Sequence, residues 1–285
     1  MGKLFTLLAG SFLLVSGLFA QENKLVYTYD IGTYKVHLLS ENQGQGKPDI
    51  LIGATPEMLE KYTDNGSFPN AVNAFLVQTG TKNILVDTGF GRELFKNMAS
   101  VGVAPEQIDV VLITHMHGDH IGGMLQNDVP AFPHAEVYIA QPEYDYWNDQ
   151  EGETSQKKVI AAYKDKLHLF QPAMVDRETD NLFEGFQGIA AYGHTPGHTM
   201  FLVKSGDQQL MIWGDLTHAM AIQMPHPEVA VTYDVDPKAA IESRQKVLQY
   251  VAEKNIPVAG MHVAYPGSGY VKASPSGGYT FTPLN

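Results

Sequence analysis

The stretch HMHGDHIGG, residues 115–123, contains three histidines and an aspartate within six positions. It follows the apolar run IDVVLI, residues 108–113, whose pattern is typical of a buried strand. The loop therefore begins at the carboxyl end of a strand, where open α/β sheets tend to bind ligands. Alternate residues of an extended segment face the same way, which places His115 and His117 together. Gly118 lets the chain turn, so we expect Asp119 and His120 to point at the same place.

Three later segments add side chains that can bind metal, each in a loop beside a predicted strand. YGHTPGH contains His194 and His198, WGDLTH contains Asp215 and His218, and GMHVAY contains His262. The chain has no cysteine, which excludes disulfides, thiolate ligands and a cysteine nucleophile. Any metal is therefore expected to be held by nitrogen and oxygen atoms.

Composition limits the size and the partners of the protein. The chain has 285 residues, 44% of them hydrophobic, which is ample material for a core. Beyond residue 20 there is no linker rich in Pro, Gly or Ser and no repeat, so residues 21–285 are predicted to form a single domain. The formal net charge is -12, and no block of Lys and Arg could neutralise a phosphate backbone. We therefore expect no nucleic-acid partner.

The N-terminal segment indicates export. Lys3 precedes an apolar run over residues 4–19, and Ala20 comes before the polar Gln21. This is the pattern of a secretory signal peptide, predicted here over residues 1–20. A membrane anchor is the alternative, but the run of about 16 residues is shorter than the roughly 20 needed to span a bilayer. The mature protein is therefore expected to be periplasmic or secreted, with no membrane segment after cleavage.

The remaining chain alternates between strand and helix patterns. A hairpin is predicted over residues 24–40, and two further strands surround the turn Thr79-Gly80-Thr81. More strands are predicted at residues 108–114, 135–140, 199–205, 208–213 and 256–261. Helices are predicted at residues 92–100, 142–148, 155–167 and 237–254. Asp236 as N-cap and Pro237 at the first helical position mark the last helix best. Strands mixed with helices that must cover both sheet faces predict layered α/β packing.

Together these motifs resemble the metallo-β-lactamase superfamily of hydrolases. The matching elements are H-x-H-x-D-H at 115–120, G-H-T-P-G-H at 193–198, G-D at 214–215, the final His262, and LVDTG at 85–89. The resemblance implies an αββα sandwich with a two-metal site. It implies the following ligands: His115, His117 and His194 for the first metal, Asp119, His120 and His262 for the second, and Asp215 as a bridge between them.

The resemblance also implies supporting roles. Asp87 in LVDTG would orient the metal loop without binding metal, as ligands usually need such support. His198 and His218 are predicted to lie beside the ligands and act through hydrogen bonds or structure. Tyr144, Tyr146 and Trp147 in EYDYWND could form part of an apolar substrate pocket, or of an amphipathic helix that packs on the sheet.

The ligand set and the resemblance predict a metal-dependent hydrolase. Ligands of this kind suit two zinc ions, although iron or manganese could also enter such a site. A metal-bound hydroxide would be the nucleophile, with Asp119 holding it or moving a proton. The segments after Gly214 look most like the branch with methyl parathion hydrolase and related lactonases, which implies a neutral ester, lactone or organophosphate substrate. The alternatives are a β-lactamase and a metal-binding member without hydrolytic turnover.

Overall fold

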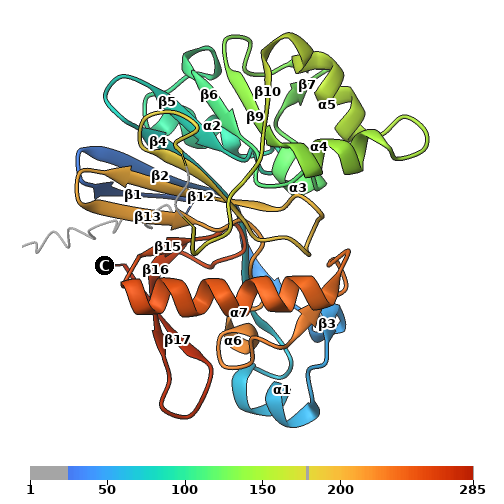
Figure 1. Cartoon of the computed structure of the whole chain (residues 1–285), viewed down its shortest axis with the longest axis vertical. Coiled ribbons are helices and arrows are strands. Elements are labelled where there is room, and N and C mark those ends of the chain that lie inside the picture. Colours follow the sequence, from blue (N-terminus) through green and yellow to red (C-terminus); the bar gives the residue numbers. More distant parts are fainter. Residues whose placement is uncertain (1–24, 178–179, 285) are drawn as a thin grey trace, which may run out of the picture.

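Two mixed β-sheets form the centre of the molecule in the computed structural model, which describes residues 25–177 and 180–284 (Figure 1). The first sheet has seven strands in the order β1-β2-β4-β5-β6-β9-β10, and the second has six in the order β11-β12-β13-β15-β16-β17. The strands of the first sheet are β1 (Val26–Ile31), β2 (Tyr34–Gly46), β4 (Phe68–Gln78), β5 (Asn83–Val86), β6 (Val110–Leu112), β9 (Glu136–Ala140) and β10 (Leu167–Phe170). Those of the second are β11 (Phe186–Ala190), β12 (Thr199–Ser205), β13 (Gln208–Ile212), β15 (Val258–Ala259), β16 (Ser268–Ala273) and β17 (Tyr279–Pro283).

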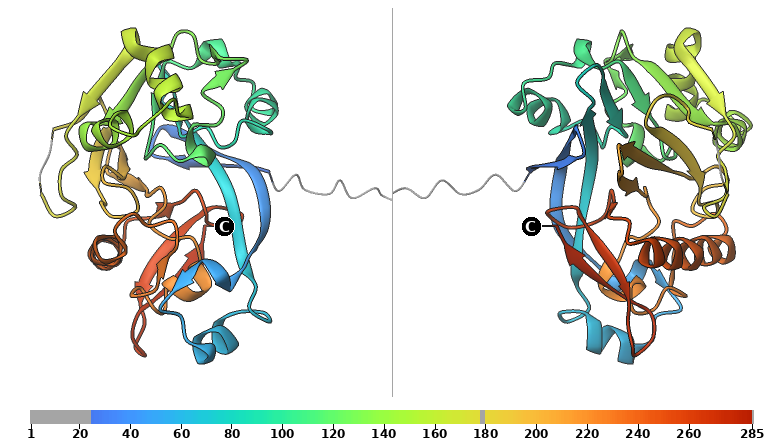
Figure 2. Two further views of the ribbon diagram at one scale, coloured as in Figure 1. Left: turned by 90° about the vertical axis from the view of Figure 1, so that its right-hand side faces the viewer. Right: turned by 60° about the vertical axis from the view of Figure 1, so that its left-hand side comes forward.

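Helices cover the outer face of each of the two sheets. The α-helices are α1 (Pro56–Tyr62), α2 (Leu94–Ser100), α3 (Gly118–Ile121), α4 (Gln141–Asn148), α5 (Ser155–Tyr163), α6 (Met220–Gln223) and α7 (Pro237–Lys254). Two small two-stranded sheets complete the structure: β3 (Leu51–Ile52) with β14 (Ala230–Val231), and β7 (Leu125–Gln126) with β8 (Val129–Pro130). In the left view of Figure 2, α7 is seen end-on at the far side of the molecule from α2.

Three hydrophobic layers hold the sandwich together. The middle layer joins the facing sides of the two sheets, with Phe75 and Val86 from the first and Phe201 and Ile212 from the second fully buried. A second layer packs the outer face of the first sheet against α2 and α5, and a third packs the second sheet against α7. A sheet must bury one face against another element, and here each sheet buries both faces. The αββα sandwich expected from the sequence is confirmed.

Helix α7 shows how local sequence sets these boundaries. The Asp236 carboxylate accepts a hydrogen bond from the Ala239 N–H, and Pro237 occupies the first helical position. Asn255 ends the helix in the left-handed region, with φ of 52°. Ala240, Val247, Leu248 and Val251 form the buried face. The range predicted from the sequence, 237–254, matches the helix in the structure.

The structure also departs from the sequence prediction in places. The helix expected over residues 155–167 ends at Tyr163, and Leu167 instead begins the edge strand β10, which pairs in parallel with β9. The hairpin of β16 and β17 and helix α1 were not predicted. The predicted signal peptide, residues 1–20, lies outside the described residues. Within residues 25–177 and 180–284, no helix has the length and apolar character needed to cross a membrane.

Candidate metal centre

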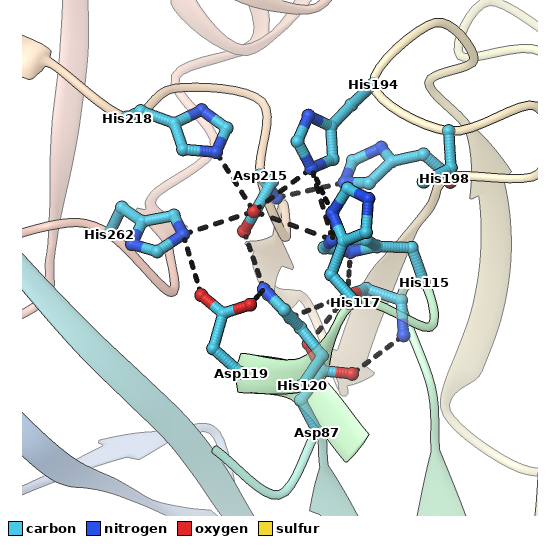
Figure 3. Close-up of polar contacts among 12 residues, drawn as sticks. Asp87, His115, His117, Asp119, His120, His194, His198, Asp215, His218 and His262 are labelled. Carbon is cyan, nitrogen blue, oxygen red and sulfur yellow. Dashed lines mark hydrogen bonds and ion pairs between the residues drawn. The ribbon is translucent and has the colours of Figure 1, made fainter. Parts of the chain in front are cut away.

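The seven predicted ligands converge at one end of the sandwich, although they come from four separate loops (Figure 3). Four of them, His115, His117, Asp119 and His120, lie in and just after the β6–α3 loop, at the carboxyl end of β6 in the first sheet. The second sheet contributes the rest, from the loops that follow β11, β13 and β15: His194, Asp215 and His262. The site therefore bridges the two sheets.

The first group of ligand atoms contains three histidine nitrogens. His115 Nε2 lies 3.0 Å from His117 Nδ1 and 3.2 Å from His194 Nε2, and the latter two nitrogens are 3.0 Å apart. Asp215 Oδ2 is 3.5 Å from His115 Nε2 and 3.3 Å from His194 Nε2. Around one tetrahedral zinc with bonds of about 2.0 to 2.1 Å, ligand atoms are separated by about 3.3 Å. The spacing of the group fits a shared cation.

The second group is more open. Asp119 Oδ1 lies 3.7 Å from His120 Nε2, and Asp119 Oδ2 lies 3.6 Å from His262 Nε2. His120 Nε2 and Asp215 Oδ1 are buried and make no hydrogen bond with good geometry, although they are 3.2 Å apart. Buried polar atoms normally have partners, so orphaned ligand atoms are consistent with a bound cation.

Asp215 connects the two groups. Its Oδ2 faces the first group and also lies 3.1 Å from His262 Nε2, while its Oδ1 faces His120. Burial raises the pKa of this carboxyl, but the surrounding histidines outweigh burial and hold the pKa well below its usual range. Asp215 is therefore an anion placed between two sets of nitrogen ligands. The cluster as a whole is compatible with a dinuclear metal site.

Hydrogen bonds on the outer side of the rings fix which nitrogen faces the centre. His120 Nδ1 donates to Asp87 Oδ2 at 2.7 Å, and His262 Nδ1 donates to the Ala71 carbonyl at 2.7 Å. Asp87 also accepts the Thr114 N–H and hydroxyl, at 2.8 and 2.6 Å. Asp87 thus contacts the Thr114 backbone and the outer nitrogen of His120, and it does not itself reach the ligand atoms that face the centre. Such partners set the tautomer of a metal-binding histidine.

Asp234 does the same for His194, and the sequence analysis did not identify it. Its Oδ1 accepts a hydrogen bond of 2.9 Å from His194 Nδ1, and its Oδ2 accepts the Val231 N–H. Asp234 stands in the segment TYDVDP, 40 residues from His194. No local motif marks the pairing, because only the loop before α7 brings the two together.

The two remaining histidines differ in their contacts. His198 Nδ1 donates to the Ala191 carbonyl at 3.0 Å, and His198 Nε2 accepts the Asp215 N–H at 2.9 Å. Both ring nitrogens are thus used, and His198 holds the backbone of Asp215. His218 Nε2 lies 3.1 Å from Asp215 Oδ2, and its ring stacks on His262 at a centroid distance of 4.6 Å. His218 is therefore part of the cluster, within reach of the second group.

Comparison with known proteins assigns the chain to a family. The model of the metallo-beta-lactamase superfamily matches residues 68–259, which is more than half of the chain. The chain belongs to this superfamily. The prediction of a metal-dependent hydrolase is confirmed at this level.

Several superfamily members are similar to the chain. The solved structure of the hydrolase AbOPH of the beta lactamase superfamily is 29% identical, with a TM-score of 0.81, and the match covers 91% of this chain and 97% of that one. AidC, a dizinc quorum-quenching lactonase, is 24% identical, with a TM-score of 0.83 and coverage of 92% and 99%, a likeness of fold. The atrochrysone carboxyl ACP thioesterase of Aspergillus chevalieri is 33% identical over 128 residues, 42% of this chain and 41% of that protein. The match thus spans about two fifths of this curated relative.

A cleft of about 640 Å³ opens directly on the ligands of this superfamily site. Ligands of both groups, including His117, Asp119 and His262, line its floor. Its walls include the apolar side chains of Ile50, Phe90 and Tyr233, with Phe90 42% and Tyr233 53% exposed.

The walls differ from those expected from the sequence. Tyr144, Tyr146 and Trp147 do not line the cleft. They belong to α4, where Tyr144 and Trp147 pack against the core on the outer face of the first sheet. The indole N–H of Trp147 donates to Glu143, and its ring lies edge-on to His117 at 5.8 Å. The alternative of a helix that packs on the sheet describes this segment, with Trp147 supporting a ligand from behind.

Proposed function

We propose that the protein is a dinuclear zinc hydrolase that cleaves a neutral ester, lactone or organophosphate. The observation that carries this proposal is the cleft, because both ligand groups form its floor and apolar side chains form its walls. A substrate that enters would present its reacting carbonyl or phosphoryl group to the ligand cluster, with its apolar part against Phe90 and Tyr233.

The charge of the cleft supports a neutral substrate. Among the described residues that line it, Lys47 is the one with a permanently positive side chain, whereas Asp49, Asp119 and Asp215 are acidic. A polyanion such as DNA or RNA would need several basic side chains to offset its phosphates. The nuclease activity known among other superfamily members is therefore disfavoured.

The donor set supports zinc. Five histidine nitrogens and two carboxylates, without sulfur, are ligands that zinc accepts in sites of this type. When bound, two such ions supply Lewis-acid polarisation of the substrate oxygen and activation of a water molecule as nucleophile. The chain itself holds the ions at the floor of the cleft and supplies the apolar side chains of the cleft walls.

Asp119 is the residue placed to move a proton. Its side chain is 23% exposed and lines the cleft, unlike the buried Asp215. Burial raises its pKa, but His120 and His262 outweigh burial and hold the pKa below its usual range. Asp119 is thus a carboxylate at neutral pH, able to accept a proton from an attacking water and return it to the leaving oxygen.

We further propose that the mature protein acts in the periplasm or outside the cell. The support is the sequence of residues 1–20, with one cation, an apolar run and a small residue before Gln21. Mass spectrometry of the N-terminus after cell fractionation tests this. Cleavage near Gln21 in an extracytoplasmic fraction is expected, and intact Met1 in the cytosol would overturn it.

A substrate panel tests the proposed activity. The purified protein is assayed on an N-acyl lactone, an aryl ester, a phosphotriester, an acyl thioester and a β-lactam, each with and without a chelator. We expect turnover of at least one of the first three, abolished by the chelator and restored by zinc. If only the β-lactam or only the thioester were turned over, that compound class would replace the ester, lactone or organophosphate proposed here. Turnover that resists the chelator would overturn the metal mechanism, and zinc binding without turnover of any substrate would indicate a binding protein.

A further inference from the structure

A buried carboxylate on α4, Glu143, joins the two loops that contain all three histidines of the first ligand group. It is fully buried and accepts four hydrogen bonds from three separate segments. Glu143 Oε1 accepts the Met116 N–H at 2.8 Å and the Trp147 indole N–H at 2.6 Å. Glu143 Oε2 accepts the Thr195 hydroxyl at 2.5 Å and the Gly197 N–H at 3.1 Å. Met116 and Thr195 adjoin ligands in sequence, Trp147 contacts the ring of His117, and Gly197 belongs to the loop of His194.

The contact with Met116 acts on the two ligands beside it in sequence. Met116 stands between His115 and His117, so the position of its peptide groups sets the direction of both rings. Glu143 holds the N–H of Met116, and Gln156 Nε2 of α5 donates to its carbonyl at 2.8 Å. Both backbone groups of this residue are thus held by buried side chains from the helical layer, which leaves the loop little freedom to move.

The contacts with Thr195 and Gly197 act on the loop of His194. Thr195 follows this ligand directly, and Gly197 lies so close to α4 that a Cβ there would be 2.1 Å from the Glu143 nitrogen. The loop can therefore approach the carboxylate only because residue 197 is glycine. One side chain thereby sets the distance between the His115–His117 loop and the His194 loop.

The contact with Trp147 acts on His117. The other four histidines of the ligand set have a polar partner for the ring nitrogen that faces away from the cluster: Thr114, Asp87, Asp234 and the Ala71 carbonyl. Within residues 25–177 and 180–284, His117 Nε2 has no such partner. Its ring is instead held by the edge-on contact with Trp147, whose own orientation is set by the hydrogen bond to Glu143.

We propose that Glu143 is a positioning residue for the first metal: it pre-orders His115, His117 and His194 before an ion binds. The inference rests on the dinuclear centre of the proposed function. A carboxylate suits this role because it accepts at all four positions, whereas a glutamine would present its amide N–H groups to two of the four donors. Loss of such support typically reduces metal affinity about 10-fold to 100-fold.

The test is a zinc titration of metal-free protein, wild type and Glu143→Gln, against a chelator of known affinity. Ring-nitrogen NMR signals of the histidines identify which ligands each ion engages. We expect the ion bound by His115, His117 and His194 to bind about 10-fold to 100-fold more weakly in the variant. The ion bound by His120 and His262 should keep its affinity. Asp87→Asn should instead weaken chiefly the binding of the ion held by His120, because Asp87 contacts His120 directly and His115 only through Thr114.

Two further variants separate positioning from general loss of stability. Glu136→Gln removes an exposed carboxylate at the start of β9 and should leave both affinities unchanged. Thr195→Val removes one of the four donors and should weaken the binding of the first ion less than Glu143→Gln does. If Glu143→Gln does not fold, the Thr195→Val variant still tests the inference. The inference would be overturned if Thr195→Val and Glu143→Gln both bound the first ion with wild-type affinity. It would also be overturned if Glu143→Gln weakened the binding of both ions equally. Failure of the wild type to bind two ions would instead overturn the proposed function.

Discussion

At the scale of single residues, carboxylates perform two different tasks in this centre. Asp119 and Asp215 face the cluster, where their charge would offset that of bound cations. Asp87 and Asp234 lie behind the histidines and fix their tautomers through hydrogen bonds of 2.7 and 2.9 Å. The second task explains why Asp87 and Asp234 are buried although neither reaches the cleft.

Protonation of His194 gives the first prediction. Burial lowers the pKa of His194, but its hydrogen bonds to Asp215 and Asp234 outweigh burial and raise the pKa to about 9. In metal-free protein this ring is therefore protonated at pH 7, and an ion must displace the proton. Zinc affinity should rise at least about 10-fold per pH unit between pH 6.5 and 8.5, because the pKa of the ligand His120 is raised as well and each displaced proton adds to the slope. Competition titrations at several pH values measure this, and an affinity independent of pH would contradict it.

Removal of the bridging carboxylate gives the second prediction. Asp215 faces both ligand groups, so Asp215→Ala should weaken the binding of both ions rather than of one. His198 accepts the Asp215 backbone N–H, a contact that alanine preserves, so the loop should keep its path. Elemental analysis after dialysis should show less than one ion per chain. Full occupancy with unchanged activity would show that Asp215 does not bridge.

At the scale of elements, the ligand loops depend on close packing against neighbouring helices. Gly193 precedes the ligand His194, has φ of 127°, and would place a Cβ 2.0 Å from the Ala240 nitrogen in α7. The Asp236 N–H also donates to the Gly193 carbonyl at 2.9 Å. The start of α7 and the ligand loop therefore approach most closely at this glycine.

Substitution of this glycine gives the third prediction. Gly193→Ala should lower the free energy of unfolding by about 2 to 4 kcal/mol, because it adds steric overlap to backbone strain. Gly80→Ala is the matched control: Gly80 has φ of 88° but has nothing within 4 Å of a Cβ. The control should cost about 1 kcal/mol. Urea unfolding measures both, and equal losses would mean that packing against α7 contributes nothing.

Sequence was a good guide to elements whose signals are local. The cap residues Asp236 and Pro237 predicted the start of α7, and the apolar run before His115 predicted β6. Both signals depend only on residues that are close together in the sequence. The resemblance of the loop motifs to a known family supplied the ligand set that the structure brings together. The LVDTG motif similarly pointed to Asp87.

Elements defined by distant contacts could not be predicted in this way. Asp234 and Glu143 support the ligand loops only after folding, and nothing in their local sequence marks a partner 40 or more residues away. The aromatic side chains of α4 suggested a pocket wall, but an amphipathic pattern does not tell which element covers which face. Strand β10 was not predicted, and its first residue, Leu167, was included in the helix expected over residues 155–167, because pairing with β9 decides the conformation of this segment.

Across the whole molecule, the candidate metal centre takes ligands from both sheets. The first sheet supplies the ligands that follow β6, and the second supplies those that follow β11, β13 and β15. An ion that binds only this arrangement stabilises the folded chain against separation of the sheets. The centre should thus contribute to stability as well as to catalysis.

Thermal unfolding gives the fourth prediction. Free zinc at about 100 times the dissociation constant should add about 2.7 kcal/mol per site to the free energy of unfolding, so the melting temperature should rise on loading. A chelator should reverse the rise. Calorimetry of metal-free and loaded protein measures the effect, and identical melting temperatures would indicate that the ligands do not bind zinc in the folded state.

Hydrolysis that depends on two ions held between the sheets is the function proposed for this chain. Its most direct test is the initial rate of hydrolysis of a substrate from the panel, measured on metal-free protein as zinc is added in known equivalents. We expect no turnover without metal and a rate that rises until about two ions are bound per chain, as a two-metal site requires. Turnover without metal, or a rate that stays at zero with both sites filled, would contradict it.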